Sequence, residues 1–580
     1  MSKFRKRLWS MIAMAALLAT TGFSAIADDD NDDRGGKYRG RYRKGSVIFF
    51  HPDGTGANHW SAARMYFEGP DGNLNWDMLP NMALYRGHML NNLIGTSNGG
   101  ATTHAFGYRV DGLGSFGKNG DGTVNPPTDV LINGLSGYQG SIMREAANAG
   151  IPVGVVNDGH IGEPGTGCFL AEVGSRNDWQ EITRQMIQGR PGFTDTAPWV
   201  IMGGGEADTR PAGTTLVHRN HNQERSQALN ANTSLRADAL DLELDWNDNG
   251  SGDLSNDPAK LDDWIVVKTR AEFEALKTAL AKNKKYAPHV LGLFAYQDTF
   301  NDRNEEDLIS RGKVTSDPVN YVGPLENTAT PPTQGFRSKA SRIILWGDVP
   351  GQAGFNPPTF KEMFEVALTI LDRAANQQKD HNNRRFFMVA EQEANDNFGN
   401  NDNAIGMLQA LRDTDEAIGV AREYVKKNRD TMILTAADSD AGGLQITAPY
   451  RNAVVTDAGY INTSNYTFGF NSNPAAGSLS LPNIPDGLEG RGQNAAASGG
   501  TKMFLAEPDR IGQTMEFAIS WPGTGDYAGA ILSRADGLNA ELLNTKFSAR
   551  FDNIDAYRMM YVTLFGKLLN YPTDPTAVER

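Results

Sequence analysis

Three short apolar runs in the chain are followed by carboxylate residues. These runs and their acids are SVIFF (46–50) with Asp53, FFMVA (386–390) with Glu391 and Asp396, and MILTA (432–436) with Asp438. In open α/β sheets, ligands bind beyond the carboxyl ends of the strands. Acidic side chains gathered there repel one another unless a cation lies among them. The pattern predicts one shared cation site, although each acid taken alone also fits a helix N-cap or a solvated loop.

A serine lies among small residues in GTSNGGATTHAFG (95–107). Ser97 fits the G-x-S-x-G pattern of serine esterases, which requires a strand before the serine and a histidine late in the chain. The preceding run MLNNLIGT (89–96) is a poor strand, and no histidine follows His381. The sequence therefore favours a hydroxyl activated by cations over one activated by histidine.

The elements that must position these residues alternate along the chain. Helical spacing of apolar residues predicts helices over 359–377 and 403–427 and an amphipathic closing helix over 553–570. Alternating strands and helices indicate a three-layer α/β sandwich around a large, mostly parallel sheet. The runs expected to form strands are 46–50, 152–156, 199–202, 290–295, 386–390 and 432–436.

Residues 45–580 are expected to form one catalytic domain. Two polar stretches, at about 207–262 and 445–512, interrupt the alternation and are predicted to be loop-rich insertions.

The N-terminus has the pattern of a secretory signal peptide. Basic residues at 3–7 precede an apolar stretch (8–23) and an A-x-A-like cleavage site at 25–27. Residues 1–27 therefore predict export to the periplasm or the medium, with no membrane association after cleavage. The charged, Gly-rich segment 28–44 is expected to be a disordered lead-in.

Charge and cysteine content restrict partners and covalent links. The formal net charge is −14, which argues against nucleic acid as a partner. Cys168 is the only cysteine, so no intrachain disulfide can form. Stability must come from the core, and bound metals are expected to add to it.

Taken in order, the motifs resemble those of the alkaline phosphatase family. HPDGTGANHWSAAR (51–64) is similar to its D-G-x-G…A-A-R opening, and TSNGGAT (96–102) to its nucleophile signature T-D-S-A-A-x-A-T. FFMVAEQEAND (386–396) resembles F-F-x-x-V-E-x-x-x-x-D, and LTAADSD (434–440) resembles T-A-D-H. The resemblance implies a metal-dependent phosphomonoester hydrolase that acts on small phosphate esters through a phosphoserine, and it implies a homodimer. The implied residues are Ser97 as nucleophile, Asp53 as bridging metal ligand, Glu391 for magnesium, and Asp396 and Asp438 for the catalytic metals.

EPGTGCFLAEVGSR (163–176) resembles the segment that carries the magnesium-site threonine and the phosphate-binding arginine. The resemblance implies these roles for Thr166 and Arg176. Because the spacing is one residue short, Glu163 remains an alternative to Thr166 at the magnesium site.

The family's zinc-binding histidines are missing from their expected positions. By resemblance they fall at Asn400, Ser439 and Tyr527. Imidazole suits zinc, whereas oxygen ligands suit Mg²⁺, Ca²⁺ or Mn²⁺. We expect Mg²⁺ and two further divalent ions, which are Zn²⁺ in the family and Ca²⁺, Mn²⁺ or Mg²⁺ in an oxygen-rich site. Three histidines elsewhere remain candidates to restore nitrogen ligation: His51, His104 and His160.

The stretch DWNDNGSGDLSND (245–257) also resembles a calcium loop. Its candidate ligands at loop positions 1, 3, 5 and 9 are Asp245, Asn247, Asn249 and Asp253. Position 12 is Asn256 rather than Glu, so a calcium loop and a plain polar loop both stay open.

Two alternatives to a phosphomonoesterase also stay open. One is phosphodiester or sulfate ester hydrolysis on the same scaffold. The other is an exported protein that binds metal or phosphate without catalysis.

Overall fold

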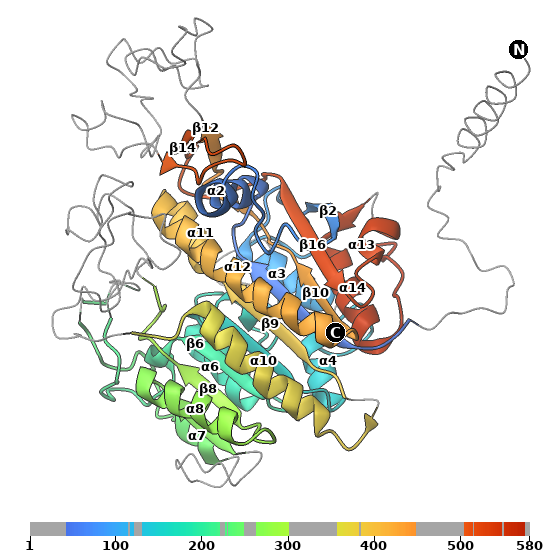
Figure 1. Cartoon of the computed structure of the whole chain (residues 1–580). Helices are drawn as coiled ribbons and strands as arrows, with labels where there is room; N and C mark the ends of the chain where they lie inside the picture. Colours follow the sequence, from blue (N-terminus) through green and yellow to red (C-terminus); the bar gives the residue numbers. More distant parts are fainter. Residues whose placement is uncertain are drawn as a thin grey trace, which may run out of the picture. The chain divides into compact units, whose positions relative to one another are not determined.

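A ten-stranded sheet forms the middle layer of the computed structural model (Figure 1). Its strand order is β17-β2-β16-β10-β1-β9-β5-β6-β8-β7, and β16 alone in this sheet runs antiparallel to both of its neighbours. The strands are β1 (Ser46–Pro52), β2 (Asn81–Arg86), β5 (Val153–His160), β6 (Val200–Gly204), β7 (Trp264–Val267), β8 (His289–Leu293), β9 (Phe387–Gln392), β10 (Thr431–Thr435), β16 (Ile531–Gly537) and β17 (Phe551–Asp552).

The structure describes residues 42–113, 116–120, 130–220, 225, 227–228, 230–248, 263–300, 356–381, 384–447, 504–513, 515–547 and 550–574. The predicted signal peptide (1–27), most of the lead-in (28–44) and most of the insertion at 445–512 lie outside these residues.

All six predicted strands are confirmed, as β1, β5, β6, β8, β9 and β10. They lie inside the sheet, covered on both faces, so their sequences read as continuous apolar runs. Four strands of the sheet were not predicted. β2, β7 and β16 alternate between buried and more exposed residues, and β17 has two residues.

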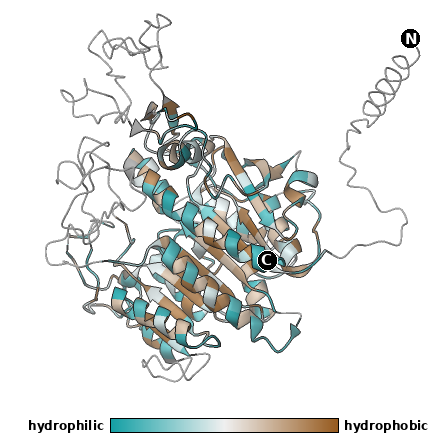
Figure 2. Ribbon diagram, in the orientation of Figure 1, coloured by the Kyte–Doolittle hydropathy of each residue, from teal (hydrophilic) through white to brown (hydrophobic). Residues whose placement is uncertain are grey.

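Helices cover both faces of the sheet and make the predicted three-layer sandwich. On β1, Ile48 and Phe50 face one core, while Val47 and Phe49 face the other. Figure 2 shows the hydrophobic strands between helices that present hydrophilic residues outward. The first core packs against α2 (Ala57–Glu68), α8 (Arg270–Lys282), α10 (Phe360–Asn376), α11 (Ala394–Asn400) and α12 (Ala404–Lys427). The second packs against α3 (Ser97–Phe106), α4 (Ile142–Asn148), α6 (Trp179–Gln188), α7 (Leu242–Asp248), α13 (Leu542–Thr545) and α14 (Asn553–Phe565).

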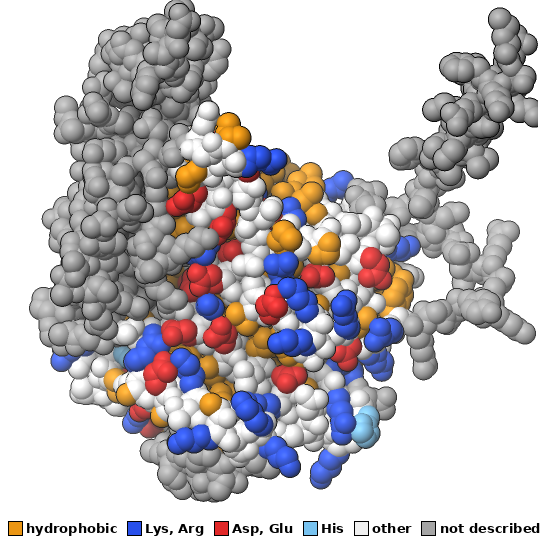
Figure 3. Space-filling model, viewed as in Figure 1, with side chains coloured by type: hydrophobic (Ala, Val, Ile, Leu, Met, Phe, Trp, Pro, Cys, Tyr) orange, Lys and Arg blue, Asp and Glu red, His pale blue; other side chains and the backbone are white. Residues whose placement is uncertain are grey.

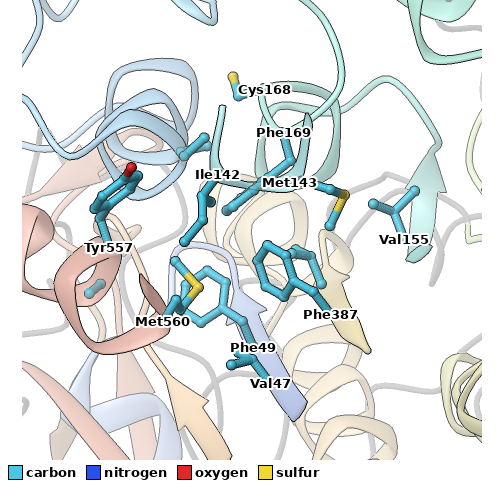
Figure 4. Close-up of a cluster of buried hydrophobic side chains, with 14 of the residues drawn as sticks. Val47, Phe49, Ile142, Met143, Val155, Cys168, Phe169, Phe387, Tyr557 and Met560 are labelled. Atoms are coloured by element: carbon cyan, nitrogen blue, oxygen red, sulfur yellow. The ribbon is translucent and has the colours of Figure 1, made fainter. Parts of the chain in front are cut away.

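The closing helix α14 forms where it was predicted, but it is not amphipathic in its burial. Every residue from Asn553 to Leu564 is buried, because α14 packs on β1 while also contacting α3 and α4. Figure 4 shows Tyr557 and Met560 in one apolar cluster with Val47 and Phe49. This buried helix supports the same face of the sheet as α3, which begins at Ser97.

Smaller elements surround the sheet. They are β3 (Lys118–Asn119) with β4 (Val130–Leu131), β11 (Asp440–Ala441) with β15 (Asp526–Tyr527), the three-stranded β12 (Gln445–Thr447), β14 (Glu516–Ser520) and β13 (Phe504–Leu505), the short helix α5 (Pro164–Gly167) and the 3₁₀ turn η1 (Glu206–Asp208). Across the residues described, no helix has the length and apolar character to cross a bilayer. Figure 3 shows acidic and basic side chains interspersed on the visible described face.

Candidate active site and metal centre

Neighbouring parallel strands bring the predicted acids to one edge of the sheet. β1 lies between β10 and β9, and His51 on β1 is in register with Glu391 on β9. Because parallel strands end at the same edge, Asp53 after β1 and Asp438 after β10 meet there. Asp53, Glu391 and Asp438 are each at most 1% exposed.

A first cluster joins His51, Asp53 and Asp438. The His51 Nε2 atom lies 3.7 Å from Asp53 Oδ1 and 3.7 Å from Asp438 Oδ1. The backbone N–H of Gly54 donates to both carboxylates, at 2.9 Å to Asp53 and 3.3 Å to Asp438. One ligand atom from each of the three residues lies within 4.8 Å of the others, a spacing that suits a metal ion.

A second cluster shares Asp53 and adds Glu393 and Asp396. Asp396 lies in α11, which begins two residues after β9 ends. We did not select Glu393 from the sequence, because the resemblance pointed to Glu391. The sequence does place Glu393 two residues after Glu391, and this spacing could have indicated it as a second acid of the site. β9 ends at Gln392, between the two, so the chain turns there and both side chains can lie at the same edge of the sheet.

Four buried oxygens in these clusters have no hydrogen-bond partner within the described structure: Asp53 Oδ2, Glu393 Oε2, Asp396 Oδ1 and Asp438 Oδ2. Buried polar atoms are normally satisfied, so each of these needs a partner of another kind. Carboxylate oxygens are the ligands that hard divalent ions prefer. The donor set therefore fits metal ions.

Burial and mutual repulsion dominate the electrostatics of the clusters. The pKa values of Asp53, Glu393 and Asp396 are raised well above their usual range, first by burial and then by neighbouring carboxylates. The pKa of Asp438 is lowered: burial opposes ionisation, but hydrogen bonding with Asp53 and the nearby His51 outweigh it. So many buried acids hold their negative charge only if positive charge is supplied between them.

Asn400, Ser439 and Tyr527 were the positions expected to replace histidines. Asn400 lies four residues after Asp396 on α11, and its Nδ2 donates to Asp396 Oδ2 at 3.0 Å and to Asp526 Oδ1 at 3.1 Å. Ser439 is buried beside Asp438, and its Oγ has no hydrogen-bond partner in the described part of the chain.

Asp526, rather than Tyr527, reaches Asn400. Tyr527 instead lines a cleft of about 440 Å³ that opens at Asp438, together with Tyr85, Arg86, His88 and Leu93. Neighbouring residues of a strand point to opposite sides, so a shift of one residue in β15 exchanges the two roles. The sequence GTGDYAG (523–529) does not show which of its two polar residues, Asp526 or Tyr527, faces the acids.

The structure brings Glu391 and Thr166 into contact. The Thr166 hydroxyl lies 3.1 Å from Glu391 Oε2, and the Gly165 N–H donates to Glu391 Oε1 at 2.7 Å. Asn157 on β5, which the sequence analysis missed, donates to both Glu391 and Thr166. The pKa of Glu391 is raised by burial, although His51 and these donors counteract the shift.

We expect Asn157→Ala to lower the free energy of unfolding by about 1–3 kcal/mol, because it leaves buried Glu391 short of a donor. Urea denaturation would measure the loss. Asn376→Ala, which removes an exposed amide bonded to a backbone carbonyl in α10, is the control and should change stability much less. Equal effects of the two substitutions would show that Asn157 does not support Glu391.

Ser97 is the first residue of α3 and is only 4% exposed. The Thr96 side chain caps the helix by accepting a hydrogen bond from the Gly99 N–H at 3.2 Å. A Cβ added at Gly100 would lie 2.6 Å from the Asp438 Cβ, so the absence of a side chain allows the first turn of α3 to approach the acids. Ser97 therefore lies at a helix N-terminus, which favours anions, and the first turn of this helix approaches Asp438 of the first carboxylate cluster.

No strand leads into Ser97: residues 87–96, all of them described, contain none. The serine esterase arrangement needs a strand, a sharp turn and then a helix. The local structure at Ser97 therefore lacks that arrangement.

Arg176 lies at the rim of the clusters. Its Nη2 donates to Glu163 Oε2 at 3.2 Å, and its side chain is 38% exposed. Although burial opposes its charge, Glu163 and the cluster acids Glu393 and Asp53 raise the pKa of Arg176. Burial raises the pKa of Glu163 to about 8 in spite of the ion pair. Glu163 thus contacts Arg176, whereas Thr166 contacts Glu391. Of the two candidates for the magnesium site, Thr166 is the one that is hydrogen-bonded to Glu391.

Two of the three candidate histidines, His104 and His160, make hydrogen bonds to residues outside the carboxylate clusters. His104 Nε2 lies 2.7 Å from the Tyr85 hydroxyl. His160 accepts from the Gly162 N–H through Nδ1 and pairs with Asp208 through Nε2. His51 is the one of the three that lies in a carboxylate cluster.

The candidate calcium loop does not begin where the sequence suggested. Asp245 and Asn247 lie within helix α7, so the predicted loop is wrong over these two residues. Asn247 donates to the Glu243 carbonyl, and Asp245 accepts from Gln188. Helical geometry turns successive side chains by about 100°, so residues two apart cannot face one ion as loop positions 1 and 3 do. Asn249 and Asp253 lie outside the described residues.

Comparisons with known proteins show the family and the fold of the chain. The alkaline phosphatase family matches residues 44–468. Over 98 residues the chain is 31% identical to the repressible alkaline phosphatase of Saccharomyces cerevisiae, a stretch that covers 16% of this chain and only 17% of the yeast protein.

Solved structures with the same fold include two bacterial alkaline phosphatases. The enzyme from the Antarctic bacterium TAB5 has a TM-score of 0.50 at 16% identity, covering 90% of this chain and 98% of that one. The enzyme from Thermus thermophilus has a TM-score of 0.52 at 16% identity, covering 91% and 92%. At such low identity these structures establish the fold alone. Because the family match extends over most of its residues, the chain belongs to the alkaline phosphatase family.

Proposed function

We propose that the protein is a metal-dependent phosphomonoester hydrolase that acts through a phosphoserine at Ser97. The observation that carries the proposal is the convergence of Ser97, at the N-terminus of α3, with buried carboxylates whose oxygens lack partners in the described structure. A phosphate monoester dianion repels a nucleophile, so positive charge must gather around it before attack.

Three groups of residues would hold the ions. His51, Asp53 and Asp438 form one group, and Asp53, Glu393 and Asp396 form another. Glu391 with Thr166 is the candidate for magnesium, held in place by Asn157. Asn400 and Asp526 adjoin Asp396 and extend the second group. Bound divalent ions would supply the positive charge that lowers the pKa of a hydroxyl and stabilises a leaving oxygen.

The chain's own residues would bind and orient the substrate. The N-terminus of α3, which begins at Ser97, would favour the negative charge of a bound phosphoryl group. The guanidinium of Arg176 would donate two hydrogen bonds to phosphoryl oxygens, and Glu163 would hold it in position. The cleft lined by Tyr85, Leu93 and Tyr527 would accept the leaving group.

The reaction would take place in two successive displacements at phosphorus. Ser97 Oγ forms a bond to phosphorus as the ester P–O bond breaks, the serine proton is released, and the leaving alkoxide gains a proton. Water then attacks the phosphoserine, restores the Ser97 hydroxyl and releases inorganic phosphate. An alkaline optimum is expected, because deprotonated nucleophiles gain population at high pH.

Three p-nitrophenyl esters distinguish the reaction classes. We expect the phosphate monoester to be hydrolysed with a kcat/KM at least about 100-fold above those of the bis-phosphodiester and the sulfate, since the site provides charge for a dianion. A larger kcat/KM for the diester or the sulfate would assign one of these sister reactions instead. No turnover of any ester with any divalent ion would leave a binding protein without catalysis.

We also propose that the protein is exported after removal of residues 1–27 and acts on small phosphate esters in the periplasm or the medium. The basic n-region, the apolar stretch and the cleavage pattern support export.

A further inference from the structure

His51 has an unusual environment for a buried histidine. It is fully buried in β1, and neither ring nitrogen has a hydrogen-bond partner within the described structure. A buried imidazole normally binds through at least one nitrogen, to a donor, an acceptor or a metal. Its Nε2 instead faces Asp53 Oδ1 and Asp438 Oδ1, at 3.7 Å from each.

These distances fit an ion between the three atoms. A contact of 3.7 Å is too long for a hydrogen bond. Two ligands at about 2.0–2.1 Å from a tetrahedral zinc lie about 3.3 Å apart, so a small inward movement brings all three atoms to coordinating distance. Asp53 Oδ2 and Asp438 Oδ2 also lack hydrogen-bond partners among the described residues.

The surroundings fix the direction of the His51 ring. It packs edge-on against His104, with ring centroids 5.4 Å apart, and His104 is itself bonded to Tyr85. On the Nδ1 side, a Cβ added at Gly165 would lie 2.6 Å from that atom. The backbone at Gly165 and the ring of His104 therefore leave Nε2 directed at the acids.

We propose that His51 Nε2 is a nitrogen ligand of a divalent ion shared with Asp53 and Asp438, supplied from β1 in place of the missing histidine at Ser439. This inference rests on the metal requirement in the proposed function. An N,O,O site favours Zn²⁺ or Co²⁺ more than an all-oxygen site does. The neighbouring cluster of Asp53, Glu393 and Asp396 has oxygen ligands alone and favours Mg²⁺, Mn²⁺ or Ca²⁺. The two sites thus differ in ion preference.

Nitrogen coupling to a paramagnetic ion tests the inference without measuring activity. The metal-free full chain, labelled with ¹⁵N-histidine, is loaded with Co²⁺, the paramagnetic ion that the N,O,O site prefers, and is examined by low-temperature electron spin-echo spectroscopy. Co²⁺ binding is also followed by visible absorption, and the binding of Co²⁺ and of Mn²⁺ is measured by calorimetry. We expect histidine nitrogen coupling in the parent, its loss in His51→Gln, and Co²⁺ affinity reduced at least about tenfold in that variant. Free imidazole should restore the Co²⁺ spectrum of His51→Ala.

His218→Gln is the matched control. His218 is also buried, but its Nε2 contacts the carbonyl oxygens of Lys268 and Leu293 rather than the clusters. This variant should keep the coupling and the Co²⁺ affinity of the parent. Co²⁺ binding without histidine coupling in the parent, or coupling that persists in His51→Gln, would overturn the inference, and the parent measurement needs no variant to fold. A parent that binds neither ion would instead overturn the proposed metal-dependent function.

Discussion

Ser97→Ala is expected to lower kcat/KM for p-nitrophenyl phosphate by about 10³–10⁶-fold, because it removes the oxygen that attacks phosphorus. Ser97 lies on the buried first turn of α3, where alanine fits without a new contact and suits a helix. The fold should therefore persist, as circular dichroism and thermal melting would show. Steady-state kinetics at alkaline pH give the main measurement.

Ser533→Ala provides a matched control for this loss. Ser533 is a fully buried serine on β16, and its hydroxyl has no hydrogen-bond partner in the described structure. Its substitution should leave kcat/KM within about twofold of the parent. Acid quenching with ³²P-labelled substrate should trap label on the parent and none on Ser97→Ala. Turnover by Ser97→Ala close to that of the parent would refute the phosphoserine mechanism.

Chelation is the second large effect: EDTA should abolish hydrolysis and also weaken the fold. Bound ions stabilise only the folded state, by about 2.7 kcal/mol when an ion is present at 100 times its Kd. Without ions, the buried carboxylates of Asp53, Glu393 and Asp396 repel one another. Reloading with single ions should restore activity and melting temperature together, which metal analysis and calorimetry would follow.

The pH dependence of stability should separate the metal-free and loaded forms. In the metal-free fold, the pKa values of Asp53, Glu393 and Asp396 are raised above their ordinary values of 3.8 and 4.5, so these groups favour the protonated state. Their contribution is fully present below those ordinary values and is lost as the pH rises through the raised pKa values. Asp438, with its lowered pKa, opposes this trend but is a single group.

Bound ions require the ionised carboxylates, so their stabilisation grows with pH. The difference in melting temperature between loaded and metal-free protein should therefore widen from acid to alkaline pH. A difference that stays constant with pH would show that the clusters do not bind the ions. Activity that survives exhaustive chelation would contradict the metal-dependent mechanism as a whole.

The sequence alone determined the architecture and the main acids of the site. Strands such as β1 and β9 are buried on both faces, so their apolar runs are continuous and easy to recognise. The apolar runs end within two residues of the observed strand ends, which located Asp53, Glu391 and Asp438 near one edge of the sheet. β2, which lies next to the edge strand β17, carries a weaker signal, because its residues alternate between buried and exposed.

Only the tertiary structure decided which side chains share one space. Glu393 and Asp526 join the acids because the turn after β9 and the register of β15 direct them there, and a shift of one residue would exchange them with neighbours. His51 on β1 meets Asp438, which is 387 residues further along the chain, because β1 pairs with β10 in parallel register. Contacts between residues hundreds of positions apart depend on strand order and register, which the local residue pattern of each segment does not contain.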